Sequence, residues 1–503
     1  MLFNSYIFIL IFLPLAVGGY FLLNHLRRYS AATIFLFLMS LWFYAYFNIS
    51  YLPLILSSIL VNYAVCLLMK KAEKIWIRRA LLLLGASFDL GLLFYYKYFD
   101  FFSENINALF STDLPLRDLI LPLGISFFTF QQLSFLIDSY KREAPEYSFF
   151  DYALFVTFFP QLIAGPIVTH DELIPQFADR EKRTLSFDNL AHGSYLFALG
   201  LSKKVLLADV FGIAVNCAFS DVASLTTGEA LCAMLGYTLQ IYLDFSGYCD
   251  MAAGIARMMN IELPENFNSP YRSHSIVEFW RRWHMTLTRF FTKYIYIPLG
   301  GSKRGLVRTY LNILIVFLAS GIWHGAAWTF LLWGVLHGVM SVLTRAIDKI
   351  IRKIIPLEQP SQRFPLGGRI AKLVGVVVTF AFVSLTWVIF RAESITDALT
   401  FFERLFSDRT LTLRSEITRA FAQSELTLAA TTLLRFNLYA KYPSALMLGF
   451  FALSLGIVFF MPNARRLERR FTPTILRLIE TCVLLVWCIF SLSGLSTFLY
   501  FNF

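Results

Sequence analysis

Two histidines in apolar surroundings are the side chains of this sequence best suited to chemistry. One is His324, in the stretch LASGIWHGAAWTFLLWGVLHG (318–338), where Gly321 and Gly325 allow close backbone approach or a helix break. A neutral imidazole takes a proton from a hydroxyl near neutral pH, so His324 has the chemistry of a general base for acyl transfer. The alternative is a core histidine that is hydrogen-bonded to a carbonyl. His337 would face another side of a continuous helix, and we assign it a structural role.

The second histidine lies in the densest polar stretch of an otherwise apolar chain, residues 242–301. The spacing predicts that one helix carries Glu278, Arg281, Arg282, His284, Arg289 and Lys293. In that helix Glu278 reaches Arg281 and Arg282, while Trp280, His284 and Thr288 share a face. Ionisable residues cost a few kcal/mol each in a bilayer, so they tend to be kept for cavities and functional sites. The alternatives are a solvated cytoplasmic face for the arginines and a packing role for His284.

Signatures of several other classes are missing from the sequence. It contains no GxSxG elbow, HExxH or GxxxxGK[ST], so a hydrolase triad, a zinc protease and a P-loop ATPase lack their motifs. None of the six cysteines forms a CxxC pair, and we expect no metal site and no bound cofactor. Asp89, Asp244 and Asp250 lie in apolar surroundings, where carboxylates mark proton or ion paths, and they keep a transporter as the alternative.

The composition excludes a soluble fold. Of the 503 residues, 57% are hydrophobic and 15% are charged, against roughly 25% charged in soluble domains. The apolar residues come in long runs, which favours helical spans over a barrel. The net charge of +11 is concentrated between these runs, a pattern typical of cytoplasmic loops and not of nucleic-acid binding. We therefore predict an all-α polytopic membrane protein.

The elements that must position these residues are apolar segments of about 20 residues. They lie near 6–23, 31–47, 51–69, 80–96, 118–137, 149–168, 189–209, 228–258, 306–323, 325–345, 373–390, 446–461 and 477–499. The first has no basic residue ahead of it and is predicted to be a retained helix, not a cleaved signal peptide. We treat 1–503 as a single membrane-embedded domain.

The basic stretches set the expected topology, because cytoplasmic loops are rich in Lys and Arg. They are residues 70–79, 141–142, 281–304, 349–372 and 465–470. Three apolar segments separate the second stretch from the third, although two cytoplasmic loops need an even number of crossings, so one segment must re-enter or fail to span. Residues 260–304 are predicted to be re-entrant or interfacial, and the hydrophilic 392–445 is predicted to be an extracytoplasmic loop or cap.

Several strings carry a family resemblance. They are LPLGISFFTFQQLSFLID (121–138), FFPQLIAGPIV (158–168), GLSKKVLLAD (200–209), IYLDFSGYCDMA (241–252), PENFNSPYRSHSIVEFWRRWHMTLTRF (264–290), YIPLGG (296–301), WHGAAWTFLLWGVLHG (323–338) and FLYFNF (498–503). Together they resemble the membrane-bound O-acyltransferase family, in particular its bacterial branch typified by alginate O-acetyltransferase. Cys249 and Ala327 depart from that branch, where Ser and Asn are commoner, so we assign neither a donor role.

The resemblance implies a ring of about 11–12 transmembrane helices, with re-entrant or interfacial helices, around a central tunnel. It implies that His324 of the WHG motif and His284 of the WRRWH motif are catalytic. It also implies transfer of an acyl group, here acetyl from acetyl-CoA, to hydroxyls of an exported or cell-envelope polysaccharide. Such enzymes lie in the bacterial cytoplasmic (inner) membrane, among lipids, and act with a periplasmic acetyltransferase-like or esterase-like partner protein.

Substrate contacts follow from the same motifs. The basic surface of Arg281, Arg282 and Arg289 can attract the phosphates of the donor. We expect further substrate contacts from Trp323, Asn268, Tyr271 and Asp244. The alternative function is a polytopic lipid or polysaccharide transporter or flippase, which needs a cavity but no acyl donor.

Overall fold

The computed structural model describes residues 1–354, 365–407, 409–423, 425, 427–428, 431–432, 438–492 and 498–499. All regular structure in these residues is helical. The chain divides into two compact units. Unit 1 comprises the described residues of Met1–Leu201, Tyr248–Glu265 and Glu468–Asn502, and unit 2 those of Ser202–Gly247 and Asn266–Leu467.

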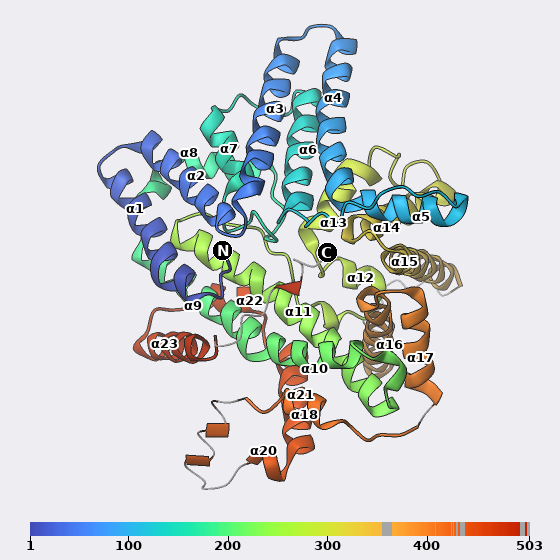
Figure 1. Ribbon diagram of the computed structural model, residues 1–503. Coiled ribbons are helices and arrows are strands. Elements are labelled where there is room, and N and C mark those ends of the chain that lie inside the picture. The colour runs from blue at the N-terminus through green and yellow to red at the C-terminus, as the bar shows by residue number, and fades with distance from the viewer. Residues whose placement is uncertain are drawn as a thin grey trace. The chain divides into compact units, whose positions relative to one another are not determined.

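Unit 1 contains the N-terminal helices. These are η1 (Phe8–Phe12), α1 (Leu13–His25), α2 (Tyr29–Ala45), α3 (Leu52–Lys71), α4 (Ile75–Leu93), α5 (Phe99–Phe110), α6 (Ile125–Lys141), α7 (Phe149–Thr157), α8 (His170–Ala178) and α9 (Phe187–Ser202), together with α23 (Ile475–Phe490). Helices α3, α4 and α6 pack side by side (Figure 1). The last turns of α11 (Thr227–Met258) also belong to this unit.

Asp89, in the last turns of α4, links these helices. Asp89 is 1% exposed, and its carboxylate accepts hydrogen bonds from Asn62 Nδ2 (2.7 Å) and Ser58 Oγ (3.1 Å) of α3. Asn62 also donates to Gln132 Oε1 of α6 at 3.0 Å. Such contacts hold membrane helices together by joining polar groups across them. Asp89 therefore has a clear packing role, which weakens its case as part of an ion path.

Unit 2 contains the segments that carry the candidate site. After η5 (Lys203–Ala208) and α10 (Asp209–Phe219) come most of α11, η7 (Pro270–Arg272), α12 (Ile276–Trp280), α13 (Met285–Phe291), η8 (Thr292–Tyr296), α14 (Leu306–His324), α15 (Trp328–Ile354) and α16 (Pro365–Arg391). They are followed by α17 (Ile395–Ser407), α18 (Ser415–Arg419), α20 (Leu438–Lys441) and α21 (Pro443–Phe460). Helices α14 and α15 form a tight hairpin (Figure 1).

Glycines allow that hairpin to close. A Cβ atom on Gly321 would lie 2.5 Å from the carbonyl oxygen of Phe330, and one on Gly334 would lie 2.5 Å from that of Phe317. Only a residue without a side chain lets the two backbones approach so closely. The expectation of close backbone approach beside His324 is confirmed.

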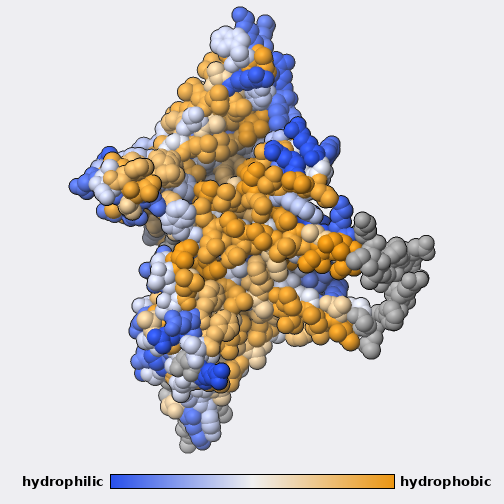
Figure 2. Space-filling view, turned by 90° about the vertical axis from the view of Figure 1, so that its right-hand side faces the viewer, coloured by the Kyte–Doolittle hydropathy of each residue, from blue (hydrophilic) through white to orange (hydrophobic). Residues whose placement is uncertain are grey.

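The described residues include six helices that are long and apolar enough to cross a membrane. They are Phe8–His25, Ile49–Lys71, Leu306–His324, Trp328–Ile351, Gly368–Arg391 and Pro443–Phe460. On α14, Val307, Leu311, Ile315 and Ile322 are all more than a third exposed, as expected of a lipid-facing stripe. Figure 2 shows that apolar side chains cover much of the visible face. The protein is a multi-pass helical membrane protein, as predicted.

Several predicted boundaries are wrong. The helix of the 118–137 segment begins only at Ile125, and α7 ends at Thr157, well inside the 149–168 segment. Residues 278–293 do not form the single helix that was predicted, because the backbone turns between α12 and α13. The predicted cap, 392–445, contains α17, α18 and α20. Three segments lie partly outside the described residues: the remainder of 392–445, the basic stretch 349–372, and the terminal FLYFNF.

Candidate functional site

His324 is the last residue of α14 and lies in an aromatic enclosure. It is 3% exposed. Its ring centroid lies 4.9 Å from that of Trp323, 5.2 Å from that of Trp333 and 5.2 Å from that of Phe390. These rings keep bulk water from the imidazole, and a dry site strengthens any interaction with developing charge.

His284 stands at the break between α12 and α13, and this break is why its predicted helix is interrupted. Its backbone is left-handed, with φ 44° and ψ 52°, a conformation that a residue with a side chain adopts only when its surroundings impose it. The residue is fully buried. Trp280 and Thr288 therefore do not share a helical face with His284, and the sequence prediction of that face is wrong.

Asn266 imposes the conformation at His284. Its Oδ1 accepts hydrogen bonds from the backbone N–H (3.2 Å) and the hydroxyl (2.9 Å) of Thr286, and it lies 3.2 Å from His284 Nδ1. Because a backbone N–H points at this atom, it must be the amide oxygen and not the nitrogen. In the neutral ring, Nδ1 therefore carries the hydrogen and Nε2 is the nitrogen that accepts a proton. Burial holds the pKa of His284 below its ordinary value.

Two backbone hydrogen bonds join the loop at Asn266 to the WRRWH segment. Met285 N–H donates to Asn266 O at 3.0 Å, and Asn268 N–H donates to Arg282 O at 2.9 Å. The side chain of Asn268 accepts from Asn463 at 3.3 Å. Asn266 is thus a site residue that the sequence analysis missed. The motif PENFN offers two asparagines, and only their distant partners distinguish them.

Trp323 joins the two histidines. Besides its contact with His324, its indole lies 6.0 Å from the ring of His284 at an angle of 65°. Phe245 of α11 covers another side of His284, with centroids 4.9 Å apart. The structure thus brings His284, Trp323 and His324 together within one unit, although the two histidines lie on different elements.

The three candidate arginines have different surroundings. Arg282 pairs with Glu278 at 2.6 Å, and His274 contacts the same carboxylate. Partial burial opposes ionisation of Glu278, but the hydrogen bond from the His274 N–H and the charge of Arg282 outweigh it and hold its pKa below the ordinary value. Arg281 and Arg289 are exposed. The predicted pairing of Glu278 with Arg282 is present, whereas the predicted pairing with Arg281 is not found among the described residues.

A cavity of about 460 Å³ has Arg281 in its lining, but neither His324 nor His284 is among its lining residues. It is lined by side chains of α12, α13, η8, α14 and α15, including Trp280, Thr288 and Ser341. Ser320, which lies one helical turn before His324 in α14, is also part of the lining. Arg345 of α15 supplies a second cation to the cavity. Arg345 is not among the predicted substrate contacts, because it lies on an apolar helix distant in sequence from the other arginines.

His337 holds the wall of this cavity, in keeping with the structural role assigned to it. Trp280 Nε1 donates to His337 Nδ1 at 3.2 Å, and His337 Nε2 lies 2.9 Å from the hydroxyl of Thr386. The Thr386 hydroxyl in turn donates to Val383 O at 2.9 Å. The chain of donors fixes the tautomer with hydrogen on Nε2, and it fixes the orientation of the Trp280 indole.

The last two candidates have strong contacts inside the protein. The Tyr271 hydroxyl donates to Thr238 O at 2.6 Å and accepts from Trp387 Nε1 at 3.2 Å. Asp244 forms an ion pair with Lys204 at 2.6 Å, and Lys204 also pairs with Asp209 at 2.7 Å. Both Tyr271 and Asp244 are buried. These contacts favour positioning of the surrounding segments over direct contact with substrate.

Comparison with known proteins gives a consistent family. A model of the MBOAT, or membrane-bound O-acyltransferase, family matches residues 30–388. The chain is 42% identical to a peptidoglycan O-acetyltransferase of Helicobacter pylori, over 79% of this chain and 78% of that protein.

Two further relatives widen the range of named activities. The chain is 37% identical to a probable alginate O-acetylase, AlgI, of Pseudomonas aeruginosa, over 84% of this chain and 77% of that protein. It is also 28% identical to a teichoic acid D-alanyltransferase of Bacillus subtilis, over 56% of this chain and 71% of that protein. With its membrane helices and buried WHG histidine, the chain belongs to the membrane-bound O-acyltransferase family and is an O-acyltransferase.

Proposed function

We propose that this O-acyltransferase moves an acetyl group from acetyl-CoA, a cytoplasmic thioester, to hydroxyls of an exported or cell-envelope polysaccharide. The observation that carries the proposal is the cavity between Arg281 and the turn of α14 that ends at His324. Cationic side chains in the lining of a cavity, with a buried imidazole one helical turn from the lining residue Ser320, suit a donor with an anionic body and a reactive thioester.

Arg281 and Arg345 are the cations proposed to bind the phosphates of coenzyme A. Both line the cavity, and neither forms an ion pair with a carboxylate among the described residues. Arg289 is exposed on α13 and adds to the basic surface. Arg282 is committed to Glu278 and is proposed to stabilise the loop instead.

His324 is proposed as the general base. It removes the proton from the attacking hydroxyl as the oxygen bonds to the carbonyl carbon of the thioester. The C–S bond then breaks, and the proton passes from the imidazolium to the departing thiolate. The products are an acetyl ester and the free thiol of coenzyme A, so atoms and charges balance. Direct acylation of His324, followed by transfer to the hydroxyl, is the competing route.

His284 is proposed to orient the reacting groups through an acceptor nitrogen. In the neutral ring Nδ1–H faces Asn266, so Nε2 cannot donate a hydrogen bond to an oxyanion. An acceptor is suited to hold a hydroxyl or a thiol proton. We therefore propose that His284 orients a reacting group and does not donate to the developing oxyanion.

The acceptor and the partner are proposed from the relatives. Proteins named as acetylating peptidoglycan and as probable alginate acetylases are similar to this chain over most of its length. Both substrates lie outside the cytoplasmic membrane, whereas acetyl-CoA is made inside. We therefore place the enzyme in the bacterial inner membrane and propose that a periplasmic acetyltransferase-like or esterase-like protein receives the acetyl group or delivers it to the polysaccharide.

Radiolabelled acetyl-CoA tests the reaction. The purified full chain, with its periplasmic partner and polysaccharide, should transfer label, and His324→Ala should lower turnover by about 10²- to 10⁴-fold, as expected for loss of a base. His192→Ala is the control, because His192 lies in unit 1 and contacts Asp188 and Glu468. Label on His324 after rapid acid quench would select the acyl-histidine route.

Three results would overturn the proposal in whole or in part. A His324→Ala protein that keeps more than about a tenth of wild-type turnover cannot have lost its base. Transport of lipid or polysaccharide without any acyl transfer would instead select the flippase. Transfer from a D-alanyl thioester but not from acetyl-CoA would replace the acetyl donor by an aminoacyl donor, as the name of the Bacillus relative suggests.

A further inference from the structure

A second cavity, of about 730 Å³, lies in unit 1 along α1. Its wall on this helix runs from Ile9 to His25, with Leu13, Val17 and Phe21 recurring every four residues between them. Sixteen helical steps of 1.5 Å make this wall roughly 24 Å long. It is therefore long enough to contact a hydrocarbon chain along the whole of one leaflet, which is roughly 15 Å thick. The volume lies within the range of about 300 to 1,000 Å³ that is usual for ligand pockets.

The lining is apolar along its length and polar at one end. Leu190 and Phe197 of α9, Met258 of α11 and Leu485 of α23 complete the apolar wall. Most of the polar lining residues gather where α1 ends: Asn24, His25, Arg183 and Thr184; Ser194 of α9 is the exception. A cavity of this kind matches a molecule with a long hydrocarbon chain and a charged head.

The charge at the polar end is not neutralised by the protein. The guanidinium of Arg183 donates to three neutral oxygens, those of Asn24 Oδ1 (3.3 Å), Tyr29 O (3.0 Å) and Phe177 O. It also stacks over the ring of Tyr29, 5.2 Å from the centroid. Among the described residues it forms no ion pair with a carboxylate. A half-buried cation with only neutral partners attracts an anion.

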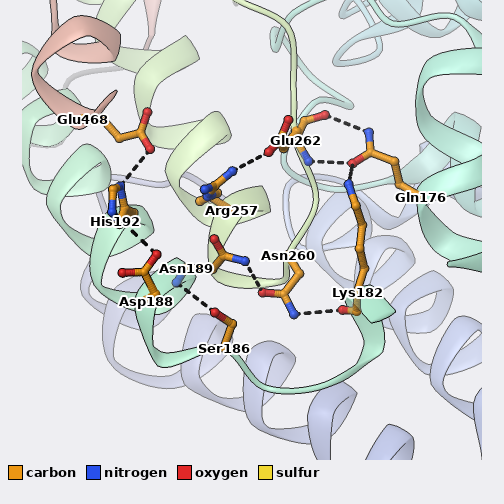
Figure 3. Close-up of polar contacts among 10 residues, drawn as sticks. All are labelled: Gln176, Lys182, Ser186, Asp188, Asn189, His192, Arg257, Asn260, Glu262 and Glu468. Atoms are coloured by element: carbon orange, nitrogen blue, oxygen red, sulfur yellow. Dashed lines mark hydrogen bonds and ion pairs between the residues drawn. The ribbon is translucent and has the colours of Figure 1, made fainter. Parts of the chain in front are cut away.

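Asn260 fixes the segment that presents Arg183 (Figure 3). The Nδ2 of Asn260 donates to the carbonyl oxygens of the two residues on either side of Arg183, Lys182 at 2.8 Å and Thr184 at 2.6 Å. Its Oδ1 accepts from Asn189 Nδ2 at 2.8 Å. Figure 3 also shows Lys182 reaching away from this point to Gln176. The arginine is therefore held between two anchored peptides, so the site is built before any ligand arrives.

We propose that this cavity binds one anionic glycerophospholipid of the cytoplasmic leaflet, with an acyl chain along α1 and its phosphate at Arg183. Arg27 and Arg28 follow α1 directly, and the positive-inside rule places that end at the cytoplasmic face. His25, exposed at the same end, supplies a second hydrogen-bond donor to the head group. The lipid would be a structural ligand of unit 1, separate from the acyl-transfer site.

Native mass spectrometry and thermal shift of the detergent-purified full chain test the proposal. The probes are phosphatidylglycerol, phosphatidylcholine and inorganic phosphate. Phosphatidylglycerol should bind about fivefold or more tightly than phosphatidylcholine, because one basic residue near an anionic head group has about that effect. Inorganic phosphate alone should raise the melting temperature far less than phosphatidylglycerol does.

Two variants test separately how the lipid head group and the acyl chain contribute to binding. Arg183→Gln should abolish the preference for phosphatidylglycerol. Gly18→Leu should weaken both lipids, because Gly18 lines the cavity and a Cβ there meets no atom within 4 Å, so the new side chain fits into the cavity without disturbing α1. This second variant keeps the test decisive even if loss of the Arg183 hydrogen bonds impairs folding.

Matched controls exist for both variants. Arg180 also stacks over Tyr29, at 5.8 Å, but does not line the cavity, so Arg180→Gln should leave lipid binding unchanged. Gly91 of α4 likewise has open space around its Cβ, and Gly91→Leu should be neutral. Equal retention of both lipids by the wild type, or undiminished binding to Gly18→Leu, would overturn the proposal.

Discussion

The imidazole of His284 and the indole of Trp323 are in direct contact, with ring centroids 6.0 Å apart. Trp323 precedes His324, and its indole also lies 4.9 Å from the His324 ring. One side chain thus connects a residue of the α12–α13 loop to the end of α14. Because aromatic side chains in a packed core resist displacement, a change at Trp323 should alter the position of both histidines.

Replacement of Trp323 tests this connection. Trp323 is 5% exposed, and Trp323→Ala should lower the free energy of unfolding by about 3 to 5 kcal/mol and should also lower kcat, because both imidazoles lose a packing partner. Trp323→Phe retains a ring and should keep most of both. Turnover and the melting temperature of the two variants are the measurements. A Trp323→Ala protein with normal kcat would show that the contact does not position the histidines.

The sequence was sufficient for the class of fold and for one local contact of the candidate site. Hydropathy predicted helical spans because no other structure satisfies the backbone of a long apolar run in lipid. His324 stood out because an imidazole is rare in so apolar a stretch. The pairing of Glu278 with Arg282 also followed from spacing, since it depends on a single turn of backbone.

The rest depends on contacts between distant segments. The left-handed backbone at His284 is imposed by Asn266, and no local pattern in WRRWHMT predicts it. Arg345 joins the cavity of Arg281 only because α15 packs against α14 and α12. Propensity and periodicity describe single elements, so they could not identify either residue.

Substitution of Asn266 should separate its structural and electrostatic effects. Asn266→Asp can still accept all three hydrogen bonds, but its negative charge should raise the pKa of His284 by about 1 to 3 units relative to the wild type. Protonation would then block the acceptor Nε2 at higher pH than in the wild type, so the acidic limb of the rate profile should move upward. Asn266→Ala should instead lose stability at every pH.

The pH–rate profile and melting temperature of these two variants provide the measurement. An Asn266→Asp enzyme whose acidic limb is unchanged would mean that His284 does not need to be neutral for turnover. An Asn266→Ala enzyme as stable as the wild type would remove Asn266 from the group of positioning residues.

The ion pair of Glu278 with Arg282 should make stability depend on pH. Its pKa is lower in the folded protein than the ordinary 4.5, so its contribution is fully present above about pH 4.5 and is lost as the pH falls through the folded value. The melting temperature of Glu278→Gln should therefore lie below that of the wild type at pH 6 to 7, and the two should converge in acid. Glu181→Gln, at an exposed position, is the control. A constant difference at all pH values would argue against an ionic contribution.

Cysteine labelling tests the proposed topology. Single cysteines at Lys74 and Arg466 should react with a membrane-impermeant reagent from the cytoplasmic side, and one at Glu416 of α18 from outside. The six native cysteines must first be replaced, because Cys482 is exposed. Reaction at Glu416→Cys from the cytoplasm alone would contradict the extracytoplasmic assignment of 392–445 and the proposed donor side.

The different surroundings of Arg281 and Arg282 predict opposite defects in neighbouring variants. Arg281 lines the cavity, and Arg281→Gln should raise the KM for acetyl-CoA by roughly tenfold, as expected for loss of a hydrogen bond to a charged group, with little change in melting temperature. Arg345→Gln should behave in the same way. Arg282 pairs with Glu278, so Arg282→Gln should lower the melting temperature and leave KM nearly unchanged.

Salt provides an independent measurement on the same proteins. Screening weakens attraction between exposed charges, so donor KM should rise with ionic strength in the wild type and rise less steeply in Arg281→Gln. The double variant Arg281→Gln, Arg345→Gln should show the smallest salt dependence. If that double variant binds acetyl-CoA as the wild type does, the phosphates do not bind at this cavity, and the donor must reach His324 by another part of the 260–304 segment.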